Sequence, residues 1–304
     1  MTSPQHESAS SPMAARRPSI SIKHRIEYLG FRLAGALFGA LSVEQASGLS
    51  GKLWRLIAPH LKRHRRARLH IAAAMPELPA QAREAILVQM WENLGRTFAE
   101  AFRMADIARE GRITLQQPDV LARVAAQGGA GVFCFGHIGN WEIGGLPATQ
   151  LGMRPAGIYQ KAHNPLVDAD ILKMRQAVNG GGVWPKDGEG ARKMLRHVRD
   201  GGALFIMADM PMHDGVPVTF FGRPAPTSGF PALVARQYQR PLFVATMVRL
   251  PHVRFSLRLT QIPLVYTPDR DSDIRELTQA IQNALEADIR ATPSQWMWAQ
   301  RRWG

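Results

Sequence analysis

From residue 113 onward, short apolar runs alternate with longer amphipathic segments. The runs are rich in β-branched and aromatic residues and are bounded by Gly, Pro and Asp, which is typical of strands. The predicted strands are 113–115, 131–135, 156–159, 182–184, 203–207, 218–221, 242–248 and 254–259. The predicted helices are 119–126, 140–150, 165–178, 188–199, 228–238 and 272–291. This alternation predicts an α/β fold, in which helices flank both faces of a mostly parallel central sheet.

The N-terminal part has a different composition. Residues 1–24 are rich in Ser, Pro and Ala, and we expect a disordered tail rather than a secretory signal, which needs an apolar core. Residues 25–62 are apolar, but their apolar stretch 29–41 contains Arg32 and is shorter than the roughly 20 residues that cross a bilayer. We therefore predict a membrane-associating helical segment that lies on or dips into a membrane, with a buried core helix as the alternative. Residues 63–304 form the remaining predicted domain.

Basic residues outnumber acidic ones. The chain has 38 Lys+Arg and 24 Asp+Glu, and its formal net charge of +14 indicates a polyanionic partner. Nucleic acid, an anionic membrane, a phosphorylated glycolipid and an acidic carrier protein all fit. The densest basic run, KRHRRAR at 62–68, directly follows the apolar segment. We expect it to contact anionic lipid, where each cation contributes about 1 kcal/mol; on a soluble protein the same run would be a solvated face.

The single cysteine, Cys134, lies inside the predicted strand 131–135. One cysteine excludes an internal disulfide and any multi-cysteine zinc or iron–sulfur site. We interpret it as a small core residue rather than a nucleophile. The chain also lacks a G-x-S-x-G motif, which argues against a serine hydrolase.

The segment GVFCFGHIGNWEIGG places an imidazole and a carboxylate just after a strand. His137 falls at the carboxyl edge of the sheet, where open α/β folds bind ligands. In one continuous helix His137 and Glu142 would lie roughly 140° apart and could not touch. A non-helical turn at His137 would instead let the carboxylate reach one imidazole nitrogen and leave the other as a general base. The alternative is a histidine that caps a strand beside an ordinary helix-terminal glutamate.

Four motifs follow one another along the chain. They are GHIGNWE at 136–142, HNPL at 163–166, FFGRPAPTSGFPALVAR at 220–236 and QWMWAQRRW at 295–303. In sequence and order they resemble the motifs of the bacterial lipid A late acyltransferases, the lauroyl and myristoyl transferases of the lysophospholipid acyltransferase superfamily. The resemblance runs from about Arg66 to Trp303 and includes MWENLGRTFAE at 90–100.

The resemblance implies a membrane-associated O-acyltransferase on the cytoplasmic face of the inner membrane, with 63–304 as the acyltransferase domain. The donor would be an acyl-acyl carrier protein. The acceptor would be a hydroxyl of a phosphorylated glycolipid, a lipid A precursor of the Kdo-lipid IVA type. His137 would take the proton of that hydroxyl, and Glu142 would orient the imidazole and stabilise its charged form. No metal or organic cofactor is implied.

Further family positions match single residues of this chain. The arginine after the NPL motif matches Arg175, which would bind phosphate or the developing oxyanion, with a solvated helix arginine as the alternative. The aspartate after the next strand matches Asp209, at a strand end where ligands gather and where aspartates also cap loops. Lys186 replaces an arginine often found at its position, so we assign it no catalytic role.

Two more residues are predicted to bind substrate. Arg223, between the Gly222 turn and a helix cap at Thr227 or Ser228, would form an anion pocket. Asn164, beside the HNPL turn, would face a phosphate. Ordinary turn chemistry is the alternative for both residues.

Near the C-terminus, Trp296, Trp298 and Trp303 stand close to Arg301 and Arg302. This combination suits a membrane interface, which we prefer, and would also suit single-stranded nucleic acid. Two alternative functions remain: an acyltransferase for another lysolipid, aminolipid or glycolipid, and a basic nucleic-acid-binding protein. Because no RNA-binding or helix-turn-helix motif is present, nucleic acid is not the expected partner.

Overall fold

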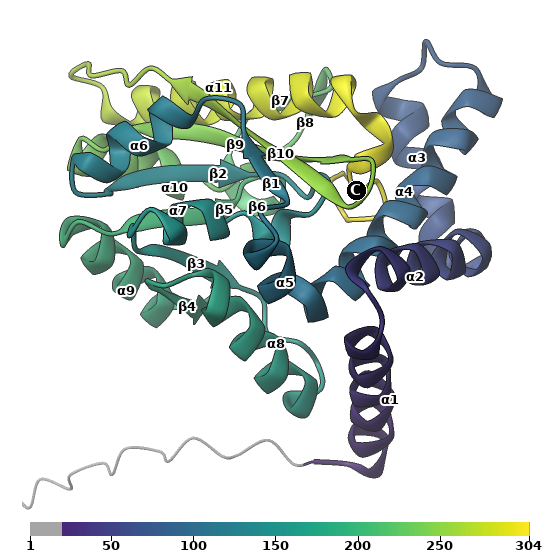
Figure 1. Cartoon of the computed structure of the whole chain (residues 1–304). Coiled ribbons are helices and arrows are strands. Elements are labelled where there is room, and N and C mark those ends of the chain that lie inside the picture. The colour runs from purple at the N-terminus through teal and green to yellow at the C-terminus, as the bar shows by residue number, and fades with distance from the viewer. Residues whose placement is uncertain (1–19, 304) are drawn as a thin grey trace, which may run out of the picture.

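A seven-stranded sheet forms the centre of the fold (Figure 1). The computed structural model describes residues 20–303. The strands are β1 (Ile113–Leu115), β2 (Gly131–Phe135), β3 (Pro155–Tyr159), β4 (Gly182–Pro185), β5 (Ala203–Met207), β9 (Leu242–Leu250) and β10 (Arg254–Ile262). Their order is β1-β10-β9-β2-β5-β3-β4, and all neighbours are parallel except β9 and β10. The predicted α/β fold with a mostly parallel sheet is confirmed.

Helices cover both faces of the sheet. They are α6 (Pro118–Ala126), α7 (Leu146–Gln150), α8 (Pro165–Val178), α9 (Gly188–Arg199), α10 (Phe230–Tyr238) and α11 (Arg270–Ala291). Alternate side chains of a strand point to opposite sides. Val132 and Cys134 of β2 therefore pack into a core with α9, α10 and α11, whereas Phe133 and Phe135 pack into a second core with α6 and α7. Cys134 is buried, as predicted.

A set of N-terminal helices precedes the sheet. They are α1 (Ile22–Ala40), α2 (Val43–Ile57), α3 (Lys62–Ala74), α4 (Ala80–Glu100) and α5 (Met104–Arg109), joined in part by the 3-10 turns η1 (Ala58–His60) and η2 (Ala101–Arg103). Helix α1 extends away from the body of the molecule (Figure 1). The Ser21 side chain accepts a hydrogen bond from the His24 backbone N–H and caps α1. The helix thus begins inside the predicted tail 1–24, of which residues 1–19 lie outside the described part.

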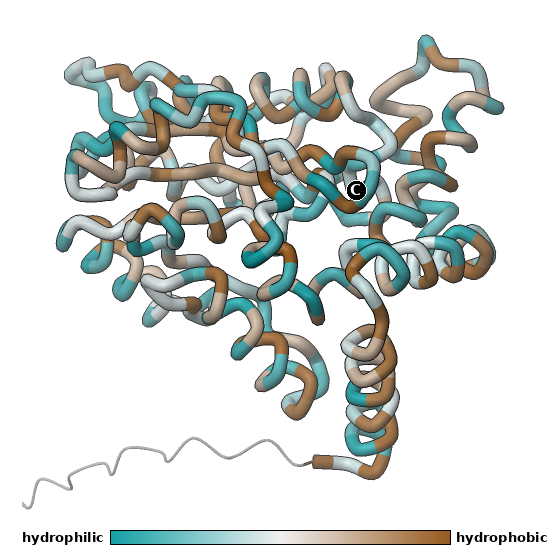
Figure 2. Tube along the Cα trace, viewed as in Figure 1, coloured by the Kyte–Doolittle hydropathy of each residue, from teal (hydrophilic) through white to brown (hydrophobic). Residues whose placement is uncertain are grey.

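Helix α1 presents a stripe of exposed apolar side chains. Hydrophobic and hydrophilic residues alternate along this helix (Figure 2). The stripe consists of Ile22, Ile26, Leu29, Leu33 and Leu37, which recur every three or four residues and so share one helix face. Helix α2 exposes Leu49, Leu53, Leu56 and Ile57. The alternative prediction for residues 25–62, a helix buried in the core, therefore does not hold for α1. None of the helices within residues 20–303 combines the length and the hydropathy that a membrane span requires.

Two predicted elements differ from the structure. The segment 140–150 is not one helix but the 3-10 turn η3 (Trp141–Ile143) followed by α7. The predicted strand 218–221 lies outside the main sheet: β7 (Thr219–Phe220) pairs with β8 (Arg223–Pro224) across a turn in which Phe221 and Gly222 both have positive φ. A further strand, β6 (Pro211–Val216), was not predicted.

The C-terminal tryptophans were expected at a membrane interface, and this prediction is wrong for Trp296 and Trp298. Both follow the 3-10 turn η4 (Pro293–Gln295), and both are fully buried. They pack beside Phe220 and Phe221, and the guanidinium of buried Arg302 lies 4.8 Å from the centre of the Phe220 ring. A sequence in which tryptophans stand close to arginines suits both a buried core and a membrane surface. The local sequence pattern therefore could not decide between these two locations.

Candidate active site

His137 and Asp209 meet at the carboxyl edge of the sheet. His137 follows β2 and Asp209 follows β5, and these two strands are parallel neighbours. The His137 Nδ1 atom lies 2.8 Å from Asp209 Oδ1, and the His137 backbone N–H donates to Asp209 Oδ2 at 2.7 Å. The carboxylate thereby holds the imidazole through Nδ1, which leaves Nε2 as the nitrogen available for chemistry.

The Asp209 side chain is fully buried. Burial alone would raise the pKa of Asp209, but the charge of His137 and the hydrogen bonds that the carboxylate accepts outweigh it and hold the pKa well below its usual range. Asp209 is therefore ionised at neutral pH. Asp209 was predicted to bind substrate; in the structure both of its oxygens face protein groups.

Glu142 was predicted to contact the imidazole of His137, but in the structure it pairs with Arg175 instead. Its carboxylate forms a two-point ion pair with Arg175: Arg175 Nε lies 2.8 Å from Oε2, and Nη2 lies 2.5 Å from Oε1. Burial would raise the pKa of Glu142, but Arg175 outweighs this effect and lowers it. The physical reason for the different pairing is topological: β5 delivers Asp209 directly to Nδ1, and η3 turns Glu142 toward α8, which carries Arg175.

A largely apolar cavity of about 600 Å³ opens beside these groups. His137, Trp141, Glu142 and Arg175 line its polar end. Its remaining walls include apolar side chains from several strands and from α10, among them Phe135, Ile158, Val183, Phe205, Met207 and Pro231. Apolar walls with a few converging polar groups are typical of sites for small molecules.

Asn164 and Arg223, both predicted to bind substrate, do not line this cavity. Asn164 is buried and caps α8 by accepting from the Leu166 backbone N–H at 3.0 Å. Its amide also donates to the His24 carbonyl oxygen of α1 at 2.8 Å. Asn164 therefore joins two helices, and Arg223 lies exposed on β8. Lys186, to which we gave no role, does line the cavity.

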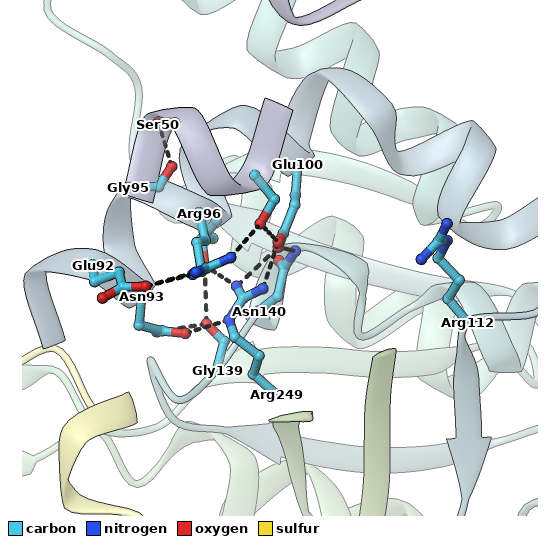
Figure 3. Close-up of polar contacts among 12 residues, drawn as sticks. Ser50, Glu92, Asn93, Gly95, Arg96, Glu100, Arg112, Gly139, Asn140 and Arg249 are labelled. Carbon is cyan, nitrogen blue, oxygen red and sulfur yellow. Dashed lines mark hydrogen bonds and ion pairs between the residues drawn. The ribbon is translucent and has the colours of Figure 1, made fainter. Parts of the chain in front are cut away.

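A buried polar network holds the loop between His137 and Glu142 (Figure 3). Gly139 has φ +59°, and a Cβ atom there would lie 1.9 Å from the Met247 carbonyl oxygen, so only glycine fits. The Gly139 carbonyl oxygen accepts from Asn93 Nδ2 and Thr97 Oγ1, both at 3.0 Å.

Glu100 is the centre of this network (Figure 3). It is fully buried, forms an ion pair with Arg249 of β9 and accepts from Asn140 Nδ2 at 2.8 Å. Asn140 Oδ1 in turn accepts from the Glu142 backbone N–H at 3.2 Å. Sequence analysis assigned no role to these positions, although the motifs at 90–100 and 136–142 contain most of them. A second signal was that polar residues interrupt the apolar helical pattern of residues 90–100.

The chain matches the family model described as "Bacterial lipid A biosynthesis acyltransferase" over residues 18–304. It is also similar to two proteins of Mycobacterium tuberculosis, both named phosphatidylinositol mannoside acyltransferase. The protein of strain H37Rv is 25% identical over 256 residues, which cover 78% of this chain and 76% of the relative. That of strain CDC 1551 is 24% identical over the same shares. Because the family match covers nearly all of the sequence, the chain belongs to the bacterial lipid A biosynthesis acyltransferases, and it is an O-acyltransferase.

Proposed function

We propose that this acyltransferase moves a fatty acyl group from acyl-acyl carrier protein to a hydroxyl of a lipid A precursor, with His137 as the general base. The observation that carries the proposal is an imidazole held through Nδ1 by a buried carboxylate at the polar end of an apolar cavity. The family match supports the acceptor class. The cavity walls suit an acyl chain, because burying its methylene groups among apolar side chains is favourable by about 0.8 kcal/mol each.

In the proposed reaction, His137 Nε2 takes the proton from the acceptor hydroxyl while that oxygen attacks the thioester carbonyl carbon. The tetrahedral oxyanion then collapses, the carbon–sulfur bond breaks, and the imidazolium returns its proton to the leaving thiolate. The products are an ester and the thiol of the carrier. Asp209 stabilises the transient imidazolium, which its ionised state at neutral pH favours.

We assign Arg175 and Glu142 to the polar end of the cavity. The guanidinium of Arg175 would face a substrate phosphate or the developing oxyanion, for which its planar fork is suited. Glu142 would keep this guanidinium in place through the ion pair, and its charge also acts on His137. Glu142 would thus contribute to the reaction without orienting the imidazole directly.

We further propose that residues 25–62 bind the cytoplasmic face of the inner membrane. The support is the row of exposed apolar residues on α1 and α2, together with exposed Lys62, Arg63, Arg65 and Arg68 at the start of α3. An apolar helix face combined with cations is the pattern of an interfacial helix on anionic lipid.

One specific observation favours a second acceptor. The two mycobacterial relatives are named for phosphatidylinositol mannoside, a glycolipid other than lipid A. The alternative function is therefore acyl transfer to another glycolipid from the same donor. It would use the same histidine and the same cavity.

A labelled-donor assay tests the proposed function. The purified protein is mixed with vesicles that contain either a lipid A precursor or phosphatidylinositol mannoside. The donor is radiolabelled acyl-acyl carrier protein or, in a parallel reaction, radiolabelled acyl-coenzyme A. The labelled lipid is identified by chromatography. We expect the label in the lipid A precursor. Label in the mannoside alone would overturn the acceptor and keep the chemistry, whereas transfer from acyl-coenzyme A but not from the carrier protein would overturn the donor.

A further inference from the structure

Residues 295–302, which we call the C-terminal segment, contact the residues of the candidate active site. The Met297 backbone N–H donates to the His137 carbonyl oxygen at 3.1 Å, and the Gly139 backbone N–H donates to the Gln295 carbonyl oxygen at 3.0 Å. Ile138 and Trp296 form an antiparallel bridge between these two bonds. The segment thus pairs with the histidine loop as a short extra strand, although more than 150 residues separate the two in sequence.

Two side chains of this segment reach the carboxylate that holds the imidazole. Trp296 Nε1 donates to Asp209 Oδ2 at 2.8 Å, and Gln300 Nε2 donates to the same oxygen at 3.1 Å. With the His137 backbone N–H, Oδ2 accepts three hydrogen bonds, whereas Oδ1 faces His137 Nδ1. Trp296 is fully buried and Gln300 is 6% exposed. One oxygen of Asp209, Oδ1, therefore faces the imidazole, and the other, Oδ2, anchors the carboxylate to the protein.

We infer that Trp296 and Gln300 are positioning residues that set the strength of His137 as a base. The inference rests on the proposed function. The two donors prevent the carboxylate from rotating, so Oδ1 stays in line with Nδ1. They also withdraw negative charge from the carboxylate, so Asp209 stabilises the imidazolium less than an unbonded aspartate would. Loss of either donor should therefore leave more negative charge on the carboxylate that faces the imidazolium.

The other charges around Asp209 and His137 do not change in the neutral pH range. Arg302, in the same C-terminal segment, acts on Asp209; burial lowers the pKa of Arg302 to about 10, so it stays charged. Glu142 from η3 has a lowered pKa, and Arg175 from α8 has a raised pKa because Glu142 outweighs the effect of burial. The acid limb is the part of the pH profile of kcat/KM in which activity rises with pH. A shift of this limb along the pH axis therefore reports on the pair of His137 and Asp209.

The test is the pH profile of kcat/KM for Trp296→Phe, with Trp298→Phe as the matched control. Both tryptophans are fully buried, and Trp298 donates its indole N–H to the Pro293 carbonyl oxygen at 2.7 Å instead of to Asp209. Each substitution removes one indole N–H and a similar volume. We expect Trp296→Phe to move the acid limb to higher pH by roughly half to one unit, because a hydrogen bond to a charged group is lost. Trp298→Phe should leave the limb in place.

Gln300→Leu provides a second variant, for the case in which Trp296→Phe does not fold. It should move the acid limb in the same direction, and the double variant should move it further. Wild-type acid limbs in both single variants, or an equal movement in Trp298→Phe, would overturn the inference. The variant His137→Ala separates this inference from the proposed function. If His137→Ala is inactive, the general base is supported even when the inference about Trp296 and Gln300 fails. If His137→Ala is active, His137 is not the general base.

Discussion

At the scale of single residues, two carboxylates share one edge of the sheet but have different partners. Asp209 holds the imidazole of His137, and Glu142 holds the guanidinium of Arg175. Spacing along the chain favours the pair of His137 and Glu142, because they are five positions apart. The structure instead brings Asp209 from 72 positions away. The roles of these carboxylates follow from their partners and not from their distance in sequence.

His137→Ala should lower kcat by at least about 100-fold, because a positioned general base contributes about 10²–10⁴-fold. The protein should still fold, but its melting temperature should fall, because the buried Asp209 carboxylate loses the imidazole that faces Oδ1. The two rates are therefore compared at a temperature at which both proteins are folded. His213→Ala is the control: this side chain is 99% exposed on β6, so the variant should keep the wild-type rate. Near-normal turnover of His137→Ala would contradict the assignment.

Asp209 should make the stability of the protein depend on pH under acidic conditions. Its pKa in the folded state lies below the value of about 3.9 for an unfolded aspartate. The ionised carboxylate therefore contributes stability that is fully present above about pH 4 and is lost as the pH falls further. Asp209→Asn removes this contribution.

The melting temperature, followed from neutral pH to about pH 3, checks this expectation. It should fall more steeply for the wild type than for Asp209→Asn. Asp214→Asn, at a side chain that is 92% exposed, should show the wild-type slope. Parallel curves for all three proteins would contradict the role of Asp209.

At the scale of elements, the loop of residues 137–140 is held by contacts with three other parts of the chain. Helix α4 binds the Gly139 carbonyl oxygen and Asn140, strand β9 contributes Arg249 through Glu100, and the C-terminal segment pairs with the backbone. Helix α2 joins the same network, because Ser47 donates to Glu100 at 2.6 Å. Helix α2, which belongs to the proposed membrane-binding segment, and the loop that follows His137 thus share one polar network around Glu100 (Figure 3).

Glu100→Gln should destabilise the protein by about 3–5 kcal/mol, because it leaves the buried charge of Arg249 without its counterion. Urea unfolding measures the change. Glu92→Gln is a matched control on the same helix, where the carboxylate pairs with Arg55 and Arg96 nearer the surface; we expect a loss of about 0–1 kcal/mol there. Equal losses for both variants would show that the network does not carry the stability we assign to it.

At the scale of the whole molecule, half of the exposed large apolar side chains in the described residues lie on α1 and α2. Helix α1 extends from the body of the molecule (Figure 2). Burial of such side chains in a lipid surface is favourable by about 25 cal/mol per Å². This arrangement would hold the cavity close to an acceptor that resides in the membrane.

Leu29→Asp combined with Leu33→Asp should reduce binding to anionic vesicles by at least about tenfold, because two exposed apolar contacts are replaced by charges that the lipid repels. Cosedimentation with vesicles measures the binding. Leu151→Asp is the control, since this leucine is also exposed but lies beyond α7. Unchanged cosedimentation of the double variant would reject α1 as the contact surface.

Much of the α/β body could be predicted from local patterns. Strands β2 and β5 match their predicted ranges because short, fully apolar runs bounded by glycine or polar residues have few other ways to bury themselves. The segment 140–150 could not be predicted, because the chain just before it pairs with the C-terminal segment and Asn140 at its start donates to Glu100 of α4. Both partners lie far away in sequence. The same holds for β7, whose turn depends on positive φ at Phe221 and Gly222.

The amino-acid sequence by itself determined the family, the class of fold and the place of His137 at the end of a buried strand, since motifs and periodicity are local properties. Only the tertiary structure decided which acid holds the imidazole, that Asn164 joins two helices, and that Trp296 and Trp298 lie in the core. The physical reason is that hydrogen bonds and burial depend on which strands become neighbours. A parallel sheet brings together strand ends that are far apart along the chain, and no local pattern records that proximity.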